Sequence, residues 1–143
     1  MSTLFTKIID GEIPGRFVWK DDDVVAFLTI APLTDGHTLV LPRQEVAHWV
    51  DAEPELLGKV MAVAQTIGKA QAAAFAPKRV GVLVEGFEVP HLHVHVWPTQ
   101  SSKDFDVHAV DHNPDPERLD ANAAALRAAL RDAGHGSRVP EAS

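Results

Sequence analysis

The stretch VPHLHVHVWP, residues 89–98, places a histidine at every second position of an otherwise apolar run. Alternate residues of a β-strand project from the same face of a sheet, about 6.6 Å apart for each two-residue step. His91, His93 and His95 are therefore predicted to share one face of a strand. The apolar residues between them occupy the other face, which is predicted to pack into the core.

Three explanations of this histidine row are open from the residues alone. Three buried rings with a purely structural role would each need hydrogen-bond partners, which is an unfavourable way to fill space. A zinc site is a second explanation, because two histidines two positions apart on a strand can bind one ion, and His37 opens a segment that could neighbour this strand. The sequence has no HExxH motif and no carboxylate at a fixed offset that would complete such a site.

The third explanation is nucleophilic attack on phosphorus. A neutral imidazole is a good nucleophile near neutral pH, and partly protonated neighbouring rings can hold phosphate oxygens. One row of histidines would then supply both the attacking atom and the groups that stabilise the developing charge. The chemistry of the row alone does not separate this explanation from the metal site.

The composition predicts one soluble domain with no nucleic-acid or membrane partner. The chain has 143 residues, 45% of them hydrophobic, and a formal net charge of -7, which repels nucleic acid and anionic membranes. It contains no cysteine, which excludes disulfides and thiolate metal sites and favours a reducing, cytoplasmic location. The N-terminal residues do not resemble a signal peptide, and no segment approaches the roughly 20 apolar residues that span a bilayer.

Hydrophobic periodicity predicts an α+β fold around an antiparallel sheet. Apolar runs predict strands at residues 16–20, 23–30, 37–42, 79–86 and 91–98, and the tight links between the first three predict an antiparallel meander. Apolar residues at three- and four-residue steps predict a long helix at 51–75, and shorter helical patterns cover 3–9 and 115–134. The last helix has Asp115 as N-cap, Pro116 at its first position and Gly134 at its C-cap. We expect one domain over residues 1–134, in which 115–134 is a helical extension, and a flexible tail over 135–143.

Three segments in a fixed order are more informative than the histidine row by itself. They are LFTKIIDGEIP at 4–14, VVAFLTIAPLTDGHTLVLP at 24–42 and HLHVHVW at 91–97. The last resembles the His-x-His-x-His signature of the histidine triad (HIT) family. The other two resemble that family's N-terminal motif and its segment ending in Gly-His-Thr-Leu-Val-x-Pro. The motif-bearing part of the chain is therefore 4–98.

The resemblance implies both a fold and a reaction. The implied fold is α+β, with a five-stranded antiparallel sheet, one long helix and a C-terminal helix. Two subunits would join their sheets in a homodimer through the long helix and the fourth strand, and the valine-rich segment 79–86 is consistent with an edge that needs a partner. The implied reaction is hydrolysis or transfer at the α-phosphorus of a nucleoside phosphate ester, anhydride or phosphoramidate, of the adenosine type and without a cofactor.

Position within the motifs implies a role for each site residue. His93 would attack phosphorus and form a nucleotidyl-histidine that water then cleaves, and His95 and His37 would contact the phosphate oxygens. His91 would support the row, and its backbone carbonyl would fix the tautomer of His93. The base would lie among apolar residues of the N-terminal half, each of which could instead be ordinary core: Phe5, Ile8, Phe17, Phe27 and Leu28.

Two positions depart from the family's pattern. Thr29 stands where many relatives have an aspartate that binds the ribose hydroxyls, so the affinity for the sugar is in question. Glu88 stands where a hydroxyl residue is expected beside the phosphate or the leaving group, and a carboxylate there repels phosphate unless it is protonated or turned away. We hypothesise that Glu88 protonates the leaving group or selects a cationic leaving amine. The alternative is that it points to solvent.

Two other functions follow from the same residues. The changes at Thr29 and Glu88 could leave a nucleotide-binding protein with little turnover, and a zinc-dependent hydrolase would use the same histidine row. The remaining residues of interest have simpler predictions: His48 and His135 at the surface, His108 and His112 in loops that could approach the cleft, Trp97 as a packing residue and Arg43 as a solvated charge.

Overall fold

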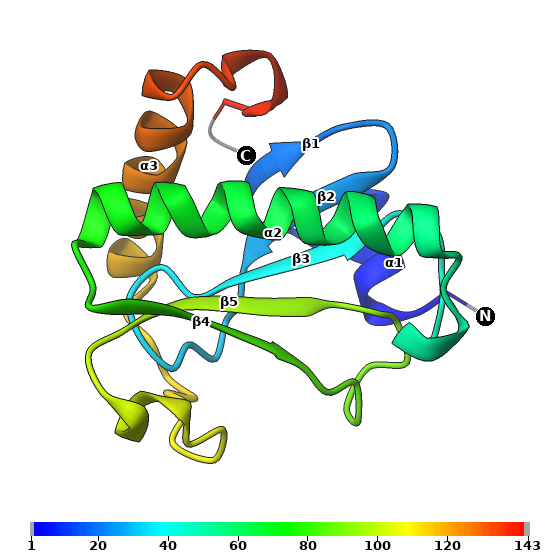
Figure 1. The fold of residues 1–143 in the computed structure, drawn as a ribbon, viewed down its shortest axis with the longest axis horizontal. Helices are drawn as coiled ribbons and strands as arrows, with labels where there is room; N and C mark the ends of the chain where they lie inside the picture. Colours follow the sequence, from blue (N-terminus) through cyan, green and yellow to red (C-terminus); the bar gives the residue numbers. More distant parts are fainter. Residues whose placement is uncertain (1, 142–143) are drawn as a thin grey trace.

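All five predicted strands form, and they pair into one antiparallel sheet (Figure 1). The computed structural model describes residues 2–141. The sheet has the strand order β1-β2-β3-β5-β4, so β4 lies at an edge and the histidine strand β5 lies inside. The predicted α+β fold is confirmed. The strands are β1 (Phe17–Lys20), β2 (Val24–Leu28), β3 (Thr38–Pro42), β4 (Arg79–Val84) and β5 (Val94–Thr99).

The three α-helices form where the hydrophobic periodicity predicted them: α1 (Leu4–Ile9), α2 (Pro54–Phe75) and α3 (Pro116–Asp132). The side chain of Thr3 caps α1, and the side chain of Asp115 caps α3 as predicted. Short 3-10 helices lie at Trp49–Asp51, Ser102–Phe105 and Gly136–Arg138. Within residues 2–141, none of the helices has the length and apolar character needed to cross a membrane.

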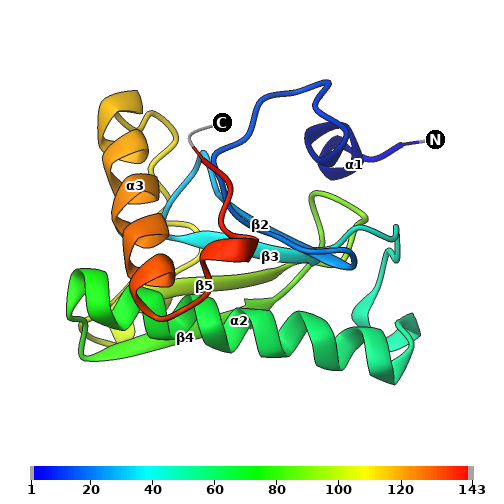
Figure 2. The same cartoon turned by 90° about the horizontal axis from the view of Figure 1, so that it is seen from above.

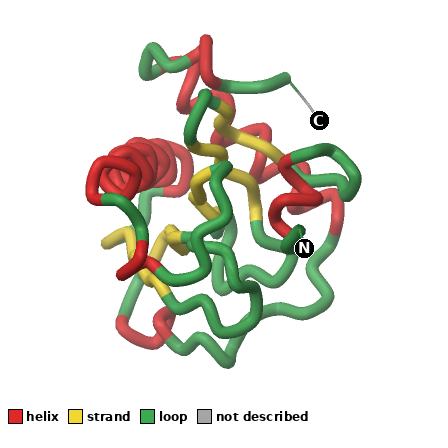
Figure 3. Tube along the Cα trace, turned by 90° about the vertical axis from the view of Figure 1, so that its right-hand side faces the viewer, coloured by secondary structure: helices red, strands yellow, loops and turns green. Residues whose placement is uncertain are grey.

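Different helices cover the two faces of the sheet. α2 runs along one face and α1 lies on the other (Figure 2), whereas α3 packs beside α2 and against β1. Figure 3 looks along α2 and shows the strands between α2 and α1. The sheet therefore separates two apolar cores, one on each face.

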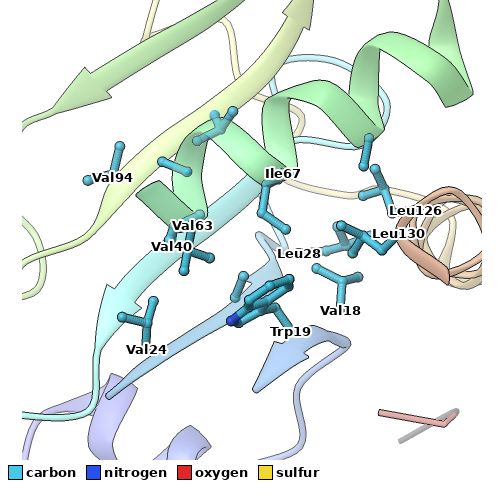
Figure 4. Packing of buried hydrophobic residues seen from close by; sticks show 14 of the residues in the cluster. Val18, Trp19, Val24, Leu28, Val40, Val63, Ile67, Val94, Leu126 and Leu130 are labelled. Atoms are coloured by element: carbon cyan, nitrogen blue, oxygen red, sulfur yellow. The ribbon is translucent and has the colours of Figure 1, made fainter. Parts of the chain in front are cut away.

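The larger core fills the space between the sheet, α2 and α3 (Figure 4). Val94 and Val96 of β5 lie in it, so the ring of His95 between them projects to the α1 side. This alternation confirms the predicted apolar face of the histidine strand. The smaller core joins α1 to the first three strands and consists of Phe5, Ile8, Phe17, Val25, Phe27, Leu39 and Leu41.

The histidine strand is shorter than predicted. β5 begins at Val94, and its pairing with both neighbouring strands also begins there. Before that residue the backbone bonds to loops, since the Leu92 N–H donates to the Val46 carbonyl at 2.6 Å and the His91 N–H donates to the Val89 carbonyl at 2.8 Å. His91 and His93 thus stand on a segment that leads into the strand.

Residues 135–141, expected to start a loose tail, pack back onto the domain. Val139 is only 8% exposed and belongs to the larger core. The ring of His135, predicted at the surface, lies 5.4 Å from the ring of Trp19, centroid to centroid. A buried apolar residue gives this segment a reason to be ordered, which its polar composition did not indicate. Residues 142–143 of the predicted tail lie outside the described residues.

Candidate active site around the histidine row

A cavity of about 410 Å³ opens on the α1 side of the sheet. Its floor includes His37, His93 and His95, which come from the start of β3 and from the segment and strand of the histidine motif. Apolar residues of α1 and β2 form one wall, and the loop between β4 and β5 forms another. Two members of the sequence-predicted row, His93 and His95, therefore line a cavity large enough for a small ligand, together with His37.

The hydrogen bonds of His93 assign its tautomer. Its Nδ1–H donates to the backbone carbonyl of His91 at 2.7 Å, so the lone pair belongs to Nε2. This is the contact predicted from the motif. The Phe5 ring packs edge-on against the imidazole, with centroids 4.8 Å apart. Burial lowers the pKa of His93 below its ordinary value, so the ring is neutral and nucleophilic at neutral pH.

His37 and His95 form a second pair with a defined proton order. The Leu33 N–H donates to Nδ1 of His37 at 3.0 Å, which places the His37 proton on Nε2. That N–H donates to Nδ1 of His95 at 2.9 Å, so His95 carries its own proton on Nε2. His95 thus offers a donor where His93 offers a lone pair.

Both rings of this pair are neutral at neutral pH. Burial, with a smaller contribution from the His95 ring, lowers the pKa of His37 to about 3. Burial, with a smaller contribution from the His93 ring, lowers the pKa of His95 to about 4. The sequence-based hypothesis that partly protonated neighbours hold the phosphate therefore needs correction. A phosphate would meet a neutral N–H donor on His95, because desolvation disfavours the imidazolium form before the ligand binds.

His91 supports the row from outside the cavity. It is 0% exposed, and its Nε2–H donates to the Pro42 carbonyl at 2.7 Å. Its Nδ1 lies 3.0 Å from the hydroxyl oxygen of Thr3 at the start of α1. Both ring nitrogens are therefore engaged with neighbouring residues, as expected of a supporting residue.

The structure brings most of the predicted binding residues to the cavity. Phe5, Ile8, Phe27, Leu28 and Thr29 line it. Phe17 does not, because it is 4% exposed and packs edge-to-face against Phe27 at 5.4 Å between centroids. Phe17 is a core residue that supports a wall residue, which was the alternative for each member of this set.

The two atypical positions both lie at the cavity. The Thr29 hydroxyl oxygen accepts from the Ala31 N–H at 3.1 Å and keeps its proton for another partner. Glu88 is exposed on the loop between β4 and β5, and Glu85 lies at the same side of the cavity. Both carboxylates are close enough to act on His93, where they oppose the effect of burial on its pKa.

Several lining residues were missed by sequence reasoning. Phe87, which is 91% exposed, stands at the cavity beside Leu83, and Val107 and Val110 approach from the segment after β5. His112 also lines the cavity, whereas His108 is exposed away from it. Loop residues carry no periodic pattern, and of these residues only His108 and His112 were named from the sequence, as loop residues that could approach the cleft.

The other predictions can be compared directly with the structure. His48 is exposed and Trp97 is buried, as predicted. Arg43 is exposed, but its Nε–H also donates to the Asp21 carbonyl at 2.8 Å. Across residues 2–141, no three histidine, cysteine, aspartate or glutamate side chains are grouped so that they could hold a metal ion.

Known proteins resemble this chain over most of its length. The family model described as the HIT domain matches residues 10–102. An uncharacterized HIT-like protein from Mycobacterium tuberculosis is 33% identical over 136 residues, which cover 91% of this chain and 94% of that protein.

Two solved structures share the fold over most of both chains. A Hit-like protein from Bartonella henselae, described as involved in cell-cycle regulation and solved with an unknown ligand, has a TM-score of 0.78 and 36% identity, covering 90% of this chain and 97% of that one. A zinc-bound histidine triad family protein from Mycobacterium smegmatis has a TM-score of 0.78 and 27% identity, covering 95% and 98%.

Proposed function

The chain belongs to the HIT family, and from this premise we propose that it is a nucleotide hydrolase or transferase acting at the α-phosphorus of adenosine-type phosphate esters, anhydrides or phosphoramidates. One observation carries the proposal. His93 turns an unprotonated Nε2 toward the cavity, and the ring beside it, with its centroid 5.0 Å away, is a donor. A nucleophile next to a donor for a phosphate oxygen is the arrangement that this chemistry requires.

The first step forms a covalent nucleotidyl-histidine. The Nε2 lone pair of His93 attacks phosphorus, and the bond from phosphorus to the leaving group breaks with its electron pair on the leaving group. The His95 N–H donates to a phosphate oxygen, and His37 holds His95 in the tautomer that allows this. The charge that develops on the His93 ring is stabilised by its Nδ1–H bond to the His91 carbonyl.

The second step releases the nucleotide. A water oxygen attacks phosphorus and gives up one proton to the solvent, the bond between phosphorus and nitrogen breaks, and the electron pair returns to Nε2 of His93. An acceptor other than water would make the same step a transfer. No cofactor takes part in either step of this proposal.

The apolar wall of the cavity suits the base and sugar. Phe5, Ile8 and Phe27 would contact the base, and the free proton of the Thr29 hydroxyl would donate to the ribose. Leu28 borders the cavity, but its side chain belongs to the larger core on the other face of the sheet. A hydroxyl forms weaker bonds to ribose hydroxyls than a carboxylate would. We therefore expect the base and the phosphate to contribute more to binding than the sugar.

Glu88 is proposed to act on the leaving group, either as a proton donor or as a partner of a cationic amine. Replacing Glu88 with Gln removes the charge with little change in size. We expect the rate on an adenosine phosphoramidate with an amine leaving group to fall about tenfold more than the rate on a diadenosine polyphosphate, which corresponds to about 1.4 kcal/mol of lost transition-state stabilisation. An unchanged ratio of the two rates would mean that Glu88 simply faces solvent.

The proposed assembly is a homodimer formed through α2 and the edge strand β4. Val82 of β4 is 48% exposed and Met61 of α2 is 40% exposed, which leaves apolar surface on both elements. β4 also has an unpaired edge, and a second copy could extend the sheet across it.

Replacement of the nucleophile tests the proposed function. We expect His93→Ala to lower kcat on adenosine phosphoramidate by about 10³-fold or more while AMP affinity, measured by calorimetry, stays largely unchanged. His48→Ala, at an exposed histidine away from the cavity, is the matched control and should keep full activity.

Two results would point to the other functions. Wild-type protein that binds AMP but turns over none of a panel of phosphoramidates, aminoacyl adenylates and diadenosine polyphosphates would be a binding protein. Activity that a chelator removes and zinc restores would favour a zinc-dependent hydrolase, because the covalent mechanism needs no metal.

A further inference from the structure

The backbone carbonyl that holds His93 is not fixed by the sheet. Pairing of β5 with β3 and with β4 begins at Val94, so the His91 carbonyl precedes the first ladder position on both sides. Its place depends instead on how the His91 residue itself is held. The side chain of His91 is 0% exposed and both of its ring nitrogens have partners.

Those partners leave one consistent arrangement of protons. The Pro42 carbonyl can only accept, so Nε2 of His91 carries the proton and Nδ1 is the acceptor. The Thr3 hydroxyl, 3.0 Å from Nδ1, must then donate to it. The Thr6 hydroxyl oxygen is farther from the same donor, at 3.3 Å, and a hydroxyl has only one proton to give.

Thr3 is in turn held by Glu45. The carboxylate accepts the Thr3 N–H at 2.8 Å and the Thr6 O–H at 2.5 Å through the same oxygen. The Thr6 hydroxyl and then the Thr3 N–H lower the pKa of Glu45, so the acceptor stays ionised at neutral pH. This link joins the start of α1 to the loop before α2, which also holds the Leu92 N–H through Val46.

We propose that Thr3 is a positioning residue for the nucleophile: its hydroxyl locks the His91 ring, and the locked residue presents the carbonyl that keeps the His93 lone pair on Nε2. The proposal rests on the proposed function, because it assigns Thr3 to the same phosphorus chemistry. The N-cap role of Thr3 does not account for this bond. Capping uses the hydroxyl oxygen as an acceptor for the Thr6 N–H at 3.1 Å and leaves its proton free.

Steady-state kinetics separate positioning from capping. Thr3→Val keeps the shape of the side chain and removes its hydroxyl, and we expect kcat on adenosine phosphoramidate to fall about tenfold, the effect of one hydrogen bond of ordinary net strength. Thr3→Ser should restore kcat. If Thr3→Val acted only by removing the cap of α1, the loosened helix would raise KM instead, because Phe5 and Ile8 of that helix line the cavity.

A second capping residue provides the matched control. Asp115→Ala removes the side-chain bond to the Glu117 N–H at the start of α3, 3.0 Å long, without contact to the histidine row. It should lower thermal stability and leave kcat unchanged. Thr3→Val that raises only KM, or that matches Asp115→Ala in kcat, would overturn the positioning role.

Nitrogen-15 spectra of the histidine rings test the inference without any turnover. In the wild-type protein His91 should show a protonated Nε2 and a hydrogen-bonded, unprotonated Nδ1, while His93 should show the opposite tautomer. Thr3→Val should shift the His91 Nδ1 signal and introduce the second tautomer at His93, and Thr3→Ser should not. An Nδ1-protonated His91 in the wild type would refute the inference, whereas an inactive wild type with the expected spectra would refute only the proposed function.

Discussion

At the scale of single residues, backbone groups assign the tautomers of His37, His91 and His93, and the His37 ring then assigns that of His95. The His91 carbonyl accepts a hydrogen bond from the His93 Nδ1–H, the Leu33 N–H donates to Nδ1 of His37, and the Pro42 carbonyl accepts from the His91 Nε2–H. Backbone partners do not titrate, so the tautomers persist over a wide pH range. Neutral rings next to one another also avoid the repulsion that charged ones would suffer.

Buried neutral histidines make the fold sensitive to mild acid. The pKa of His37 is about 3 and that of His95 about 4, against an ordinary 6.5, so below about pH 6.5 the unfolded chain binds protons that the folded protein does not. Above that pH, His37 and His95 therefore do not change the free energy of unfolding with pH. Below it, the free energy of unfolding falls as the pH drops. Each histidine contributes a slope of up to about 1.4 kcal/mol per pH unit.

Urea unfolding between pH 7 and pH 5 measures this effect, in a range where few carboxylates titrate. We expect the free energy of unfolding to fall across the range, and His37→Gln to reduce the slope. His108→Gln, at an exposed loop histidine, should leave the slope as it is. A stability that is flat with pH in the wild-type protein would show that His37 and His95 are not neutral in the fold.

At the scale of elements, periodicity predicted which segments become helices and strands, but hydrogen-bond partners decided where they end. The apolar alternation in VPHLHVHVWP continues through His91, yet β5 starts at Val94 because the residues before it bond to loops. Residues 135–141 show the same limit, since burial of Val139 depends on a space left beside α2 and α3. Such tertiary neighbours cannot be predicted from the local sequence.

At the site, residues on helices and strands could be predicted from the sequence, whereas most residues on loops could not. α1, β2 and the histidine segment were located by their motifs, so Phe5, Ile8, Phe27, Leu28 and Thr29 could be predicted to line the cavity. The opposite wall comes mostly from loops and was missed apart from Glu88 and His112. Phe87 and Val107 have no pattern that distinguishes a cavity wall from an ordinary loop residue.

At the scale of the whole molecule, the strand order within residues 2–141 leaves β4 with one unpaired edge next to partly exposed apolar residues of α2 and β4. We propose that a second copy covers this surface, because an unpaired strand edge beside exposed apolar side chains favours pairing with another chain. Joining two β4 edges would extend the sheet across the pair and leave the opposite side, where the cavity opens, accessible to ligand.

Sedimentation or light scattering tests the proposed homodimer. We expect the wild-type protein to be dimeric at micromolar concentration and Val82→Glu to be monomeric, because a charge would be buried in the contact. Val50→Glu replaces another exposed valine, 58% exposed and outside both elements, and should stay dimeric. A monomeric wild-type protein, or a dimer unaffected by Val82→Glu, contradicts the proposed contact.

The sequence by itself determined the α+β class, the five strands, the three helices, the apolar face of the histidine strand and the identity of the histidine row, because periodicity and motif spacing are local properties of the chain. Only the tertiary structure decided that the rings are neutral, that Phe17 lies in the core, that loops from two distant segments close the cavity, and that Thr3 meets His91 across 88 positions of sequence. Proton positions and burial depend on which groups come together in space, and those partners are fixed by packing of the whole chain.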